Sequence, residues 1–534
     1  MNRKGMKRAI AYALLLSSLS FSSAWAAAPE TPAESSMQTI YDQSSFNPHL
    51  KDATVVSDAT IVRVDGGKVR GAVHSGIYQY KGIPYAEARE RFVKAGPVTP
   101  WKGVRDATEY GPQSPQYVFG TNQEMKGVPS SNNDQNLNIW TPSLDRKAKK
   151  PVMVWFHGGG FSSGSANEAQ YNGENLSRKG DVVVVSVNHR LNALGHMDLS
   201  AYGEKYKDSA NVGSWDLVAS LQWVRRNISK FGGDPKNVTL FGESGGGAKV
   251  LEMMSAPAAK GLFQKGIVES GTTETMGAYF TPSAMSRELT AETLKNLQLT
   301  PDRIEELQTM PIQDIWQASD KALQKLADKY QIPNSMGAGY QMFWEPVSGT
   351  DFLPTDPVTP TGFAASGKDV PLLIGSNLTE WTTIIPSAVH SDMTETQKAM
   401  FAKAYPNEDL SYAPYVDSII RLPTLEIMDH KADQGGAPVY AYLFTKQIGN
   451  AGVYHTAEIP FVFNNLKEPS ALSDTMTALW TSFARDGVPS VAGLPVWQPY
   501  TRSNGNTMIL DDRSYLTQHH DRALLQSMFP DWKD

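Results

Sequence analysis

Cysteine is absent from this chain of 534 residues. Its absence excludes disulfide bonds, thiolate nucleophiles and cysteine-ligated metal sites. The formal net charge of −6 argues against a protein built to hold nucleic acid, and no basic cluster suggests otherwise. The content of 40% hydrophobic and 10% aromatic residues is ordinary for a globular protein with a large core. The composition is therefore that of a mildly acidic globular protein whose chemistry does not use thiols.

The first 26 residues have the features of a secretory signal peptide. Arg3, Lys4, Lys7 and Arg8 precede a short apolar run, and the small residues of the segment 24–26 suit cleavage. The run, residues 9–16, is too short for a membrane anchor, which takes about 20 apolar residues. Loss of these four basic residues changes the net charge from −6 to −10. An exported chain without disulfides is typical of a bacterial periplasm or medium, so we expect an exported bacterial protein with no stable membrane anchor after cleavage.

The rest of the chain predicts one large α/β domain. Residues 27–55 are rich in Pro, Ser, Asp and Glu, so we expect a loose polar leader. Over residues 56–534, apolar strands alternate with helical segments, which predicts a large, mostly parallel central sheet with helices on both faces. The strands read as near-continuous apolar runs, as strands buried on both faces should. These runs are 151–156, 181–187, 237–241, 265–270, 370–374 and 438–443.

Residues 275–345 interrupt the alternation of strands and helices. They contain two charged helical stretches, 284–297 and 312–329, and several aromatic residues. A helical insertion after a catalytic sheet is a common place for a lid or a pocket wall, although plain packing helices explain any single aromatic residue equally well. No internal repeat or linker marks a further domain, so we interpret this segment as a helical insertion within the one domain.

The most informative motif places a serine between glycines directly after an apolar strand. Residues 238–241 form the predicted strand, and Gly242-Glu-Ser-Gly-Gly246 follows it. On such a sharp strand-to-helix turn, the serine hydroxyl points out of the fold, where a substrate can reach it. Gly160-Phe-Ser-Ser-Gly164 fits the same Gly-x-Ser-x-Gly pattern but follows a glycine run instead of a strand. The context therefore makes Ser244 the leading candidate for a covalent nucleophile.

A second glycine-rich segment, Trp155-Phe-His-Gly-Gly-Gly160, follows directly on another predicted strand. Consecutive glycines let backbone N–H groups turn towards a developing oxyanion with no side chain in the way. We predict that N–H groups of this glycine run, together with the N–H of Gly245, form an oxyanion hole. A phosphate-binding interpretation is disfavoured because no Gly-Lys-Ser/Thr follows these glycines.

A serine nucleophile requires a base and an acid that orients the base. The α/β-hydrolase order of Ser, then Asp or Glu, then His restricts the base to the C-terminal part of the chain. The candidates are His390, His430, His455, His519 and His520. His455 lies in a loop just beyond a predicted strand, whereas His519 and His520 lie in a polar tail and are expected to be solvated. Glu380 follows a predicted strand end, where the catalytic groups of open α/β sheets gather. The residues alone leave both choices open.

These segments resemble the type-B carboxylesterases, a family that includes cholinesterases and bacterial esterases. The serine segment, residues 231–246, matches the family's signature at every constrained position. The likeness runs from about Gly67 to the C-terminus. It passes through Gly82-Ile-Pro-Tyr-Ala86, Asn188-His-Arg-Leu191, Gly261-Leu-Phe263, Ser270-Gly271, Trp480-Thr-Ser-Phe-Ala484 and Leu494-Pro-Val-Trp497. The resemblance implies an α/β-hydrolase fold and serine ester hydrolysis.

The resemblance also implies a role for each candidate residue. Ser244 is the expected nucleophile, Glu380 the acid and His455 the base. Gly158, Gly159 and Gly245 are expected to supply the oxyanion hole. Ser270 is expected to lie near the acid. Glu458 is expected to brace the histidine loop from beneath rather than to take part in the chemistry.

Some positions depart from the family's pattern. Gly245 stands where alanine is usual after the nucleophile, and Lys249 stands where a small hydroxyl residue is common. Trp381 follows the acid where glycine is usual. With Phe343 and Trp344 it hints at an aromatic-lined site, although each is equally compatible with the core. None of the departures removes a catalytic group, so they bear on the substrate more than on the reaction.

The sequence therefore predicts a serine carboxylesterase that acts on a small-molecule ester. The mechanism requires no metal or organic cofactor, and no cluster of ligating residues suggests one. The same groups would serve an amidase or an acyltransferase, and the sequence does not separate these reactions. A non-catalytic binding protein on the same scaffold is disfavoured, because the serine, the histidine and the glycines are all present.

Overall fold

The computed structural model describes residues 54–117, 128–272, 280–334, 339–359, 362–383, 385 and 388–532. The predicted signal peptide, residues 1–26, lies outside the described residues, as does the predicted leader up to residue 53.

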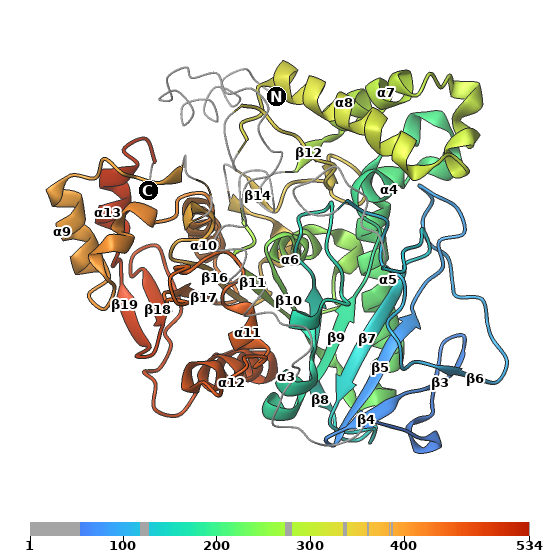
Figure 1. Cartoon of the computed structure of the whole chain (residues 1–534). Helices are drawn as coiled ribbons and strands as arrows, with labels where there is room; N and C mark the ends of the chain where they lie inside the picture. Colours follow the sequence, from blue (N-terminus) through green and yellow to red (C-terminus); the bar gives the residue numbers. More distant parts are fainter. Residues whose placement is uncertain are drawn as a thin grey trace.

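A twelve-stranded sheet forms the centre of the molecule (Figure 1). Its strands are β1 (Val55–Val56), β4 (Ala72–His74), β5 (Ile77–Pro84), β7 (Asn136–Thr141), β8 (Lys150–Phe156), β9 (Val183–Val187), β10 (Gly233–Glu243), β11 (Lys265–Glu269), β16 (Leu372–Asn377), β17 (Val439–Phe444), β18 (Asn506–Leu510) and β19 (Tyr515–Gln518). In space they follow the order β1-β4-β5-β7-β9-β8-β10-β11-β16-β17-β18-β19. A smaller sheet of β2 (Val62–Val64), β3 (Gly67–Arg70) and β6 (Val104–Asp106) lies beside it.

The middle of the large sheet is parallel. From β9 through β8, β10, β11, β16 and β17 to β18, every neighbouring pair of strands is parallel, and the pairs beyond are antiparallel. All residues of β9, β11, β16 and β17 are buried, as their apolar runs predict for strands covered on both faces. Because parallel strands end at the same edge of a sheet, the segments after β10, β16 and β17 meet there.

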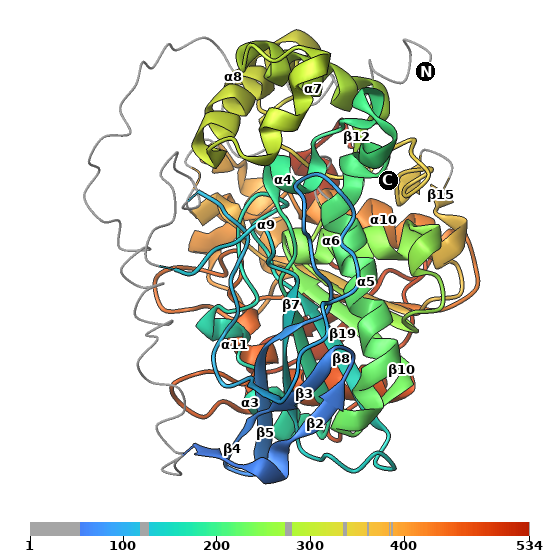
Figure 2. The ribbon, with the colours of Figure 1, turned by 90° about the vertical axis from the view of Figure 1, so that its right-hand side faces the viewer.

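Helices pack on both faces of the sheet and around its ends. They are α3 (Glu174–Gly180), α4 (Asn192–His196), α5 (Val212–Asn227), α6 (Gly245–Ser255), α7 (Ser283–Asn296), α8 (Ile312–Tyr330), α9 (Glu395–Ala404), α10 (Arg421–Asp433), α11 (Ile459–Val462), α12 (Ala471–Asp486) and α13 (Arg522–Met528). Helices α3 and α12 pack together on one face, and α5, α6 and α10 cover the other (Figures 1 and 2). The predicted fold class, a mostly parallel α/β sheet between helical layers, is confirmed.

The segment 275–345 carries α7 and α8, which lie together at one end of the molecule, at the top of Figures 1 and 2. The two helices share an apolar cluster with α4 that is separate from the main core. Leu289 of α7, Ile315 and Leu326 of α8, and Leu194 of α4 are buried in it. The insertion therefore has its own small apolar core, to which α4 contributes, and Arg91 also hydrogen-bonds its Leu307 and Met310 carbonyl oxygens.

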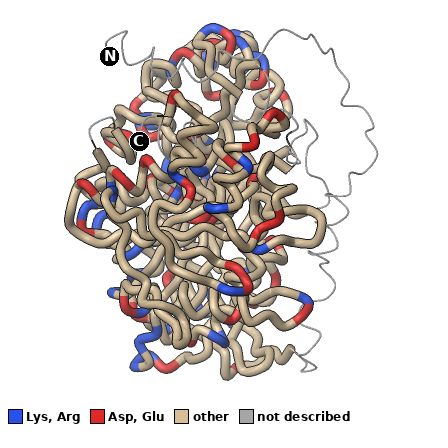
Figure 3. Tube along the Cα trace, turned by 90° about the vertical axis from the view of Figure 1, so that its left-hand side faces the viewer, with Lys and Arg blue, Asp and Glu red and all other residues tan. Residues whose placement is uncertain are grey.

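Charged residues of both signs are interspersed on the face drawn in Figure 3. Among the helices that the structure describes, none combines the length and the apolar character that crossing a bilayer requires.

Candidate active site

Ser244 occupies the turn between the central strand β10 and helix α6. The strand ends at Glu243 and the helix begins at Gly245, which leaves Ser244 with φ 55° and ψ −127°. Positive φ strains any residue that carries a side chain, and such strain is typical of a nucleophile turn. A Cβ on Gly246 would lie 2.0 Å from the Phe156 carbonyl oxygen, so only glycine lets α6 pack this closely on β8. The predicted strand-to-helix setting of Ser244 is therefore present.

His455 and Glu380 are brought together from the loops after β17 and β16. The Nδ1 atom of His455 lies 2.6 Å from the Glu380 Oε2 atom, the distance of a strong charge-assisted hydrogen bond. The two loops also pair through their backbones, since the N–H of His455 donates to the Glu380 carbonyl oxygen at 3.1 Å. The second carboxylate oxygen of Glu380 accepts the N–H of Asn377 at 2.6 Å. Both partners are thus fixed before any substrate binds.

The other ring nitrogen of His455 faces the serine turn. Its Nε2 atom lies 3.1 Å from Oε1 of Glu243, the residue before Ser244, but the contact lacks hydrogen-bond geometry. Within the described residues, neither this Nε2 atom nor the Ser244 hydroxyl makes a hydrogen bond. Burial lowers the pKa of His455 to about 4, which keeps the imidazole neutral near pH 7. A neutral Nε2 with no partner is able to accept a proton.

Buried carboxyl groups surround this histidine. Glu458 accepts hydrogen bonds from the Asn377 amide at 2.6 Å and from the Ser270 hydroxyl at 3.3 Å. Burial and the neighbouring carboxylates raise the pKa of Glu243 well above its usual range and that of Glu458 to about 7. Burial also raises the pKa of Glu380, while the N–H of Asn377 and the Ser270 hydroxyl oppose the shift. The cluster therefore does not hold all of its carboxylates ionised at neutral pH.

The loops of the site are strained at more than one point. Ser270, Glu380 and Thr456 have φ of 48°, 38° and 77°, in addition to Ser244. Positive φ at residues that carry side chains costs free energy and is concentrated at functional sites, where the surrounding contacts enforce it. Here the hydrogen bonds among the loops after β10, β11, β16 and β17 supply that enforcement.

The glycine loop after β8 lies against the serine turn. Within the described part of the chain, the N–H groups of Gly158, Gly159, Gly160 and Gly245 donate no hydrogen bond. A Cβ on Gly158 would lie 3.4 Å from the Ser244 Cβ, so the loop borders the serine directly. The backbone of Gly160, rather than that of Gly158 or Gly159, is the part of the loop closest to Gly245. Gly160 was missed as a candidate donor, although its place in the run of three glycines was a signal for it.

Trp381 lies against the histidine. Its ring centroid is 4.3 Å from that of His455, and the two planes are inclined by 31°. Of the other aromatic residues singled out in the sequence, Phe343 is 43% exposed and Trp344 is buried in the apolar cluster of the insertion. The aromatic residue in contact with the site is therefore Trp381.

The remaining histidine candidates lie elsewhere. His430 is on α10, 3.7 Å from Glu426, and His390 packs against Phe529 at a ring distance of 5.2 Å. The expectation of solvated histidines is wrong for His520, whose side chain is 5% exposed. His519 is half-buried, and its Nε2 atom hydrogen-bonds the Ser503 carbonyl oxygen at 2.9 Å. The tail that carries them is not a free end, because β19 joins the sheet and α13 packs on α9.

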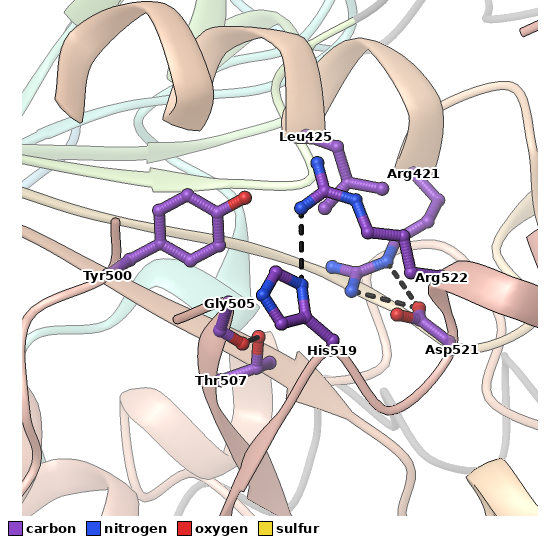
Figure 4. A pocket seen from close by; sticks show the side chains of 8 residues that line it. All are labelled: Arg421, Leu425, Tyr500, Gly505, Thr507, His519, Asp521 and Arg522. Carbon is purple, nitrogen blue, oxygen red and sulfur yellow. Dashed lines mark hydrogen bonds and ion pairs between the residues drawn. The ribbon is translucent and has the colours of Figure 1, made fainter. Parts of the chain in front are cut away.

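A small pocket near that tail is separate from the serine site (Figure 4). It is lined by Arg421, Leu425, Tyr500, Gly505, Thr507, His519, Asp521 and Arg522. Arg421 and Asp521 form a buried ion pair at 2.9 Å, so the pocket belongs to the packing of the sheet's far edge.

One further residue beside the site was not assigned a role from the sequence. Lys249, on the second turn of α6, is buried beneath the glycine loop. Its Nζ atom donates hydrogen bonds to the carbonyl oxygens of His157 at 2.9 Å and Gly160 at 2.8 Å. In the sequence, Lys249 stands out because the resembling family commonly has a small hydroxyl residue at this position. Which atoms its amine contacts is evident only from the folded structure.

Comparison with known proteins places this geometry in a family. The carboxylesterase family model matches residues 58–415 and 408–526. The para-nitrobenzyl esterase of Bacillus subtilis is 34% identical over 501 residues, which cover 88% of this chain and 98% of that protein. The phenmedipham hydrolase of Pseudarthrobacter oxydans is 27% identical over 500 residues, covering 85% and 95% of the two chains.

Solved structures agree with these sequence matches. An esterase from Clostridium hathewayi, described as able to hydrolyse aliphatic aromatic polyesters, superposes with a TM-score of 0.80 at 35% identity and covers 90% of this chain and 100% of that one. A thermophilic PNB esterase superposes with a TM-score of 0.73 at 32% identity and covers 88% and 100%. The expectation from the motifs is confirmed: the chain belongs to the carboxylesterase family, has the α/β-hydrolase fold and is an ester-hydrolysing enzyme.

Proposed function

We propose that the chain hydrolyses carboxylic esters through a Ser244–His455–Glu380 triad and an acyl-enzyme intermediate. The observation that carries the proposal is the state of His455. Its Nδ1 side is fixed by Glu380, whereas its Nε2 atom is buried, has no hydrogen-bond partner within the described residues and faces the serine turn. This is the arrangement that a base needs to activate a serine.

In the first step, Ser244 attacks the ester carbonyl carbon. The Oγ–C bond forms while the hydroxyl proton passes to Nε2 of His455, and the carbonyl oxygen becomes an oxyanion. The free N–H groups of Gly158, Gly159 and Gly245 are the proposed donors to that oxygen, with Gly160 available beside them. When the oxyanion collapses, the bond to the leaving oxygen breaks and His455 returns the proton to it, so the alcohol departs.

In the second step, a water molecule attacks the acyl-enzyme. His455 takes one proton of the water, and the new oxyanion occupies the same set of N–H groups. Collapse breaks the Oγ–C bond, and the proton from His455 restores the Ser244 hydroxyl as the carboxylic acid leaves. Glu380 holds the imidazole in the required orientation throughout and stabilises its charged form.

The substrate that we propose is a small-molecule ester. The relatives named for para-nitrobenzyl esters and for aliphatic aromatic polyesters support an acyl or alcohol part with an aromatic ring. Trp381, which lies against His455, offers such a ring a stacking surface. From residues 1–26 we also propose export to a bacterial periplasm or medium, with no stable membrane anchor after cleavage.

The proposal is tested by hydrolysis of p-nitrophenyl acetate and butyrate, with the wild-type mature chain beside Ser244→Ala. We expect the alanine variant to lose activity by about 10³-fold or more, since the nucleophile is gone. Ser220→Ala is a matched control, because Ser220 is a buried serine of α5 whose hydroxyl bonds only the Leu217 carbonyl oxygen at 2.7 Å. Equal activity of Ser244→Ala and wild type would refute the triad. Product analysis with an added alcohol separates hydrolysis from acyl transfer.

A further inference from the structure

Lys249 is placed to act on the loop that faces the substrate rather than on the substrate itself. Its side chain is fully buried, and its nitrogen bonds two carbonyl oxygens of the glycine loop, those of His157 and Gly160. No ion pair of Lys249 with a carboxylate is found among the described residues, and Glu252 and Glu243 act on it only at longer range. The hydrogen-bonding capacity of this amine is therefore directed at the loop backbone.

The positions of these two carbonyls explain what the bonds achieve. The His157 carbonyl shares a peptide plane with the N–H of Gly158, and the Gly160 carbonyl closes the other end of the glycine run. In a trans peptide the C=O and the N–H point in opposite directions. A carbonyl held towards Lys249 therefore turns the Gly158 N–H away from the helix. Glycine has the widest backbone freedom of any residue, so a loop of three glycines needs such fixed points to keep its N–H groups aimed.

Gly245 lies on the same helix as Lys249 and approaches the same glycine loop. A Cβ at position 245 would lie 2.2 Å from the Gly160 carbonyl oxygen, 2.4 Å from its Cα and 2.5 Å from its nitrogen. These atoms are backbone and do not move aside as the end of a long side chain does. The loop thus lies closer to α6 than an alanine at position 245 permits. The two departures from the family's pattern, at positions 245 and 249, meet at the same residue of the loop.

The interaction persists on both sides of neutral pH. Burial lowers the pKa of Lys249 to about 7, and the negative charges of Glu252 and Glu243 oppose this shift. An ammonium group has three donor hydrogens and a neutral amine has two. The bonds to His157 and Gly160 require two donors, so either protonation state makes both.

We propose that Lys249 is a positioning residue that draws the glycine loop onto helix α6 and so orients the oxyanion donors, and that Gly245 provides the space this position requires. The inference rests on the proposed function, since it assigns the loop to the oxyanion. It predicts that the pair Lys249 and Gly245 acts as a unit, in which changing one residue alters the effect of changing the other.

The first test compares Lys249→Met with Lys431→Met. Lys431 is a matched control: it is also buried, it donates to the carbonyl oxygens of Lys368 at 2.9 Å and Ala437 at 3.3 Å, and it lies on α10 outside the site. We expect Lys249→Met to lower kcat about 10- to 100-fold with KM changed less than about 3-fold, because the oxyanion forms only after binding. Affinity for a trifluoromethyl ketone, which forms an oxyanion on the serine, should fall in parallel. Lys431→Met should change the melting temperature alone.

The second test measures the coupling between the two positions. Gly245→Ala alone should lower kcat at least about 10-fold, because the new Cβ collides with the Gly160 backbone. Adding Lys249→Ser releases the loop, so the double variant should be more active than Gly245→Ala. Strict additivity of the two losses would overturn the proposal, as would a folded Lys249→Met enzyme whose kcat and inhibitor affinity match wild type.

Amide hydrogen exchange of residues 157–161, followed by mass spectrometry, measures how firmly the loop is held in the absence of substrate. We expect faster exchange in Lys249→Met than in wild type and Lys431→Met. Unchanged exchange would overturn the positioning role even in an active enzyme. If the wild-type chain shows no esterase activity while Lys249→Met still loosens the loop, the proposed function fails and the contact between Lys249 and the loop stands.

Discussion

The edge of the sheet where β10, β16 and β17 end carries the proposed triad and is called the catalytic edge below. This edge and the helical insertion are stabilised in opposite ways. At the catalytic edge, the ionisable groups of Glu380, His455 and Glu458 are buried and held by hydrogen bonds between loops. In the insertion, the pair of Lys325 and Glu292 at 2.8 Å lies towards the surface. The buried side chains of α7 and α8 are apolar or carry uncharged hydroxyl groups, such as those of Thr290 and Ser319. Buried ionisable groups destabilise a fold unless each is partnered, so the catalytic edge tolerates few changes. The insertion depends on apolar burial and tolerates changes of surface charge.

The largest expected effect on the rate comes from replacing the proposed base of the catalytic edge. His455→Gln should lower kcat/KM for p-nitrophenyl butyrate by about 10⁴-fold or more, because glutamine does not accept the serine proton. His430→Gln, which removes a histidine of α10 beside Glu426, should leave the rate within about 2-fold of wild type. A His455→Gln enzyme with more than a tenth of wild-type activity would contradict the assignment of the base.

The pH dependence of the rate tests the burial of the catalytic edge. Because burial lowers the pKa of His455 to about 4, kcat/KM should rise with pH to a plateau with its midpoint near pH 4 rather than near 6.5. The unfolded chain binds this proton more readily between those values, so the same group makes the fold less stable as pH falls through that window. Rates from pH 3.5 to 8, with circular dichroism at each pH to confirm folding, check the prediction. A midpoint near 6.5 would contradict it.

Trp381 is an aromatic residue at the catalytic edge, and it contacts one of the buried ionisable groups there, His455. Its ring centroid lies 4.3 Å from that of His455, close enough to stabilise the imidazolium that the proposed mechanism forms. Trp381→Ala should therefore lower kcat by about 2- to 30-fold, the range expected for a cation–π contact of roughly 0.5–2 kcal/mol. Trp381→Phe, which keeps an aromatic face, should recover most of the loss. Identical kcat values for the alanine variant and wild type would show that the stacking has no part in the chemistry.

The smallest effect on rate is expected in the insertion. Leu326→Ala should lower the free energy of unfolding by about 2–5 kcal/mol, because Leu326 is 1% exposed in the core of α7 and α8. The kcat of the folded variant should stay within about 3-fold of wild type. Urea denaturation and assays on folded protein measure the two quantities. Lys325→Ala, on the surface of the same helix, should leave the melting temperature unchanged. A loss of kcat in folded Leu326→Ala well beyond this range would tie the insertion to the chemistry.

Much of the fold was predicted because its signals are local. The apolar runs at 151–156 and 438–443 correspond to β8 and β17, and the charged stretch at 312–329 corresponds to α8 within one residue. Strand and helix periodicity are properties of neighbouring residues, so they survive in the sequence. The tail with His519 and His520 was misjudged for the converse reason. Its polar composition suggested solvent, but β19 pairs with β18, α13 packs on α9, and the His520 side chain is 5% exposed, while β19 itself stays partly exposed.

The sequence by itself determined the serine turn, the buried strands and the family. Glycines, an apolar strand and a serine within a few positions suffice for that turn, because steric limits on the backbone act between adjacent residues. Only the tertiary structure decided which histidine meets which carboxylate, since His455 and Glu380 are 75 positions apart and meet because parallel strands end at one edge. It likewise decided that Lys249 bonds the glycine loop and that Gly245 lies against Gly160. Such contacts depend on how the helix packs on the sheet, which is a property of the whole core.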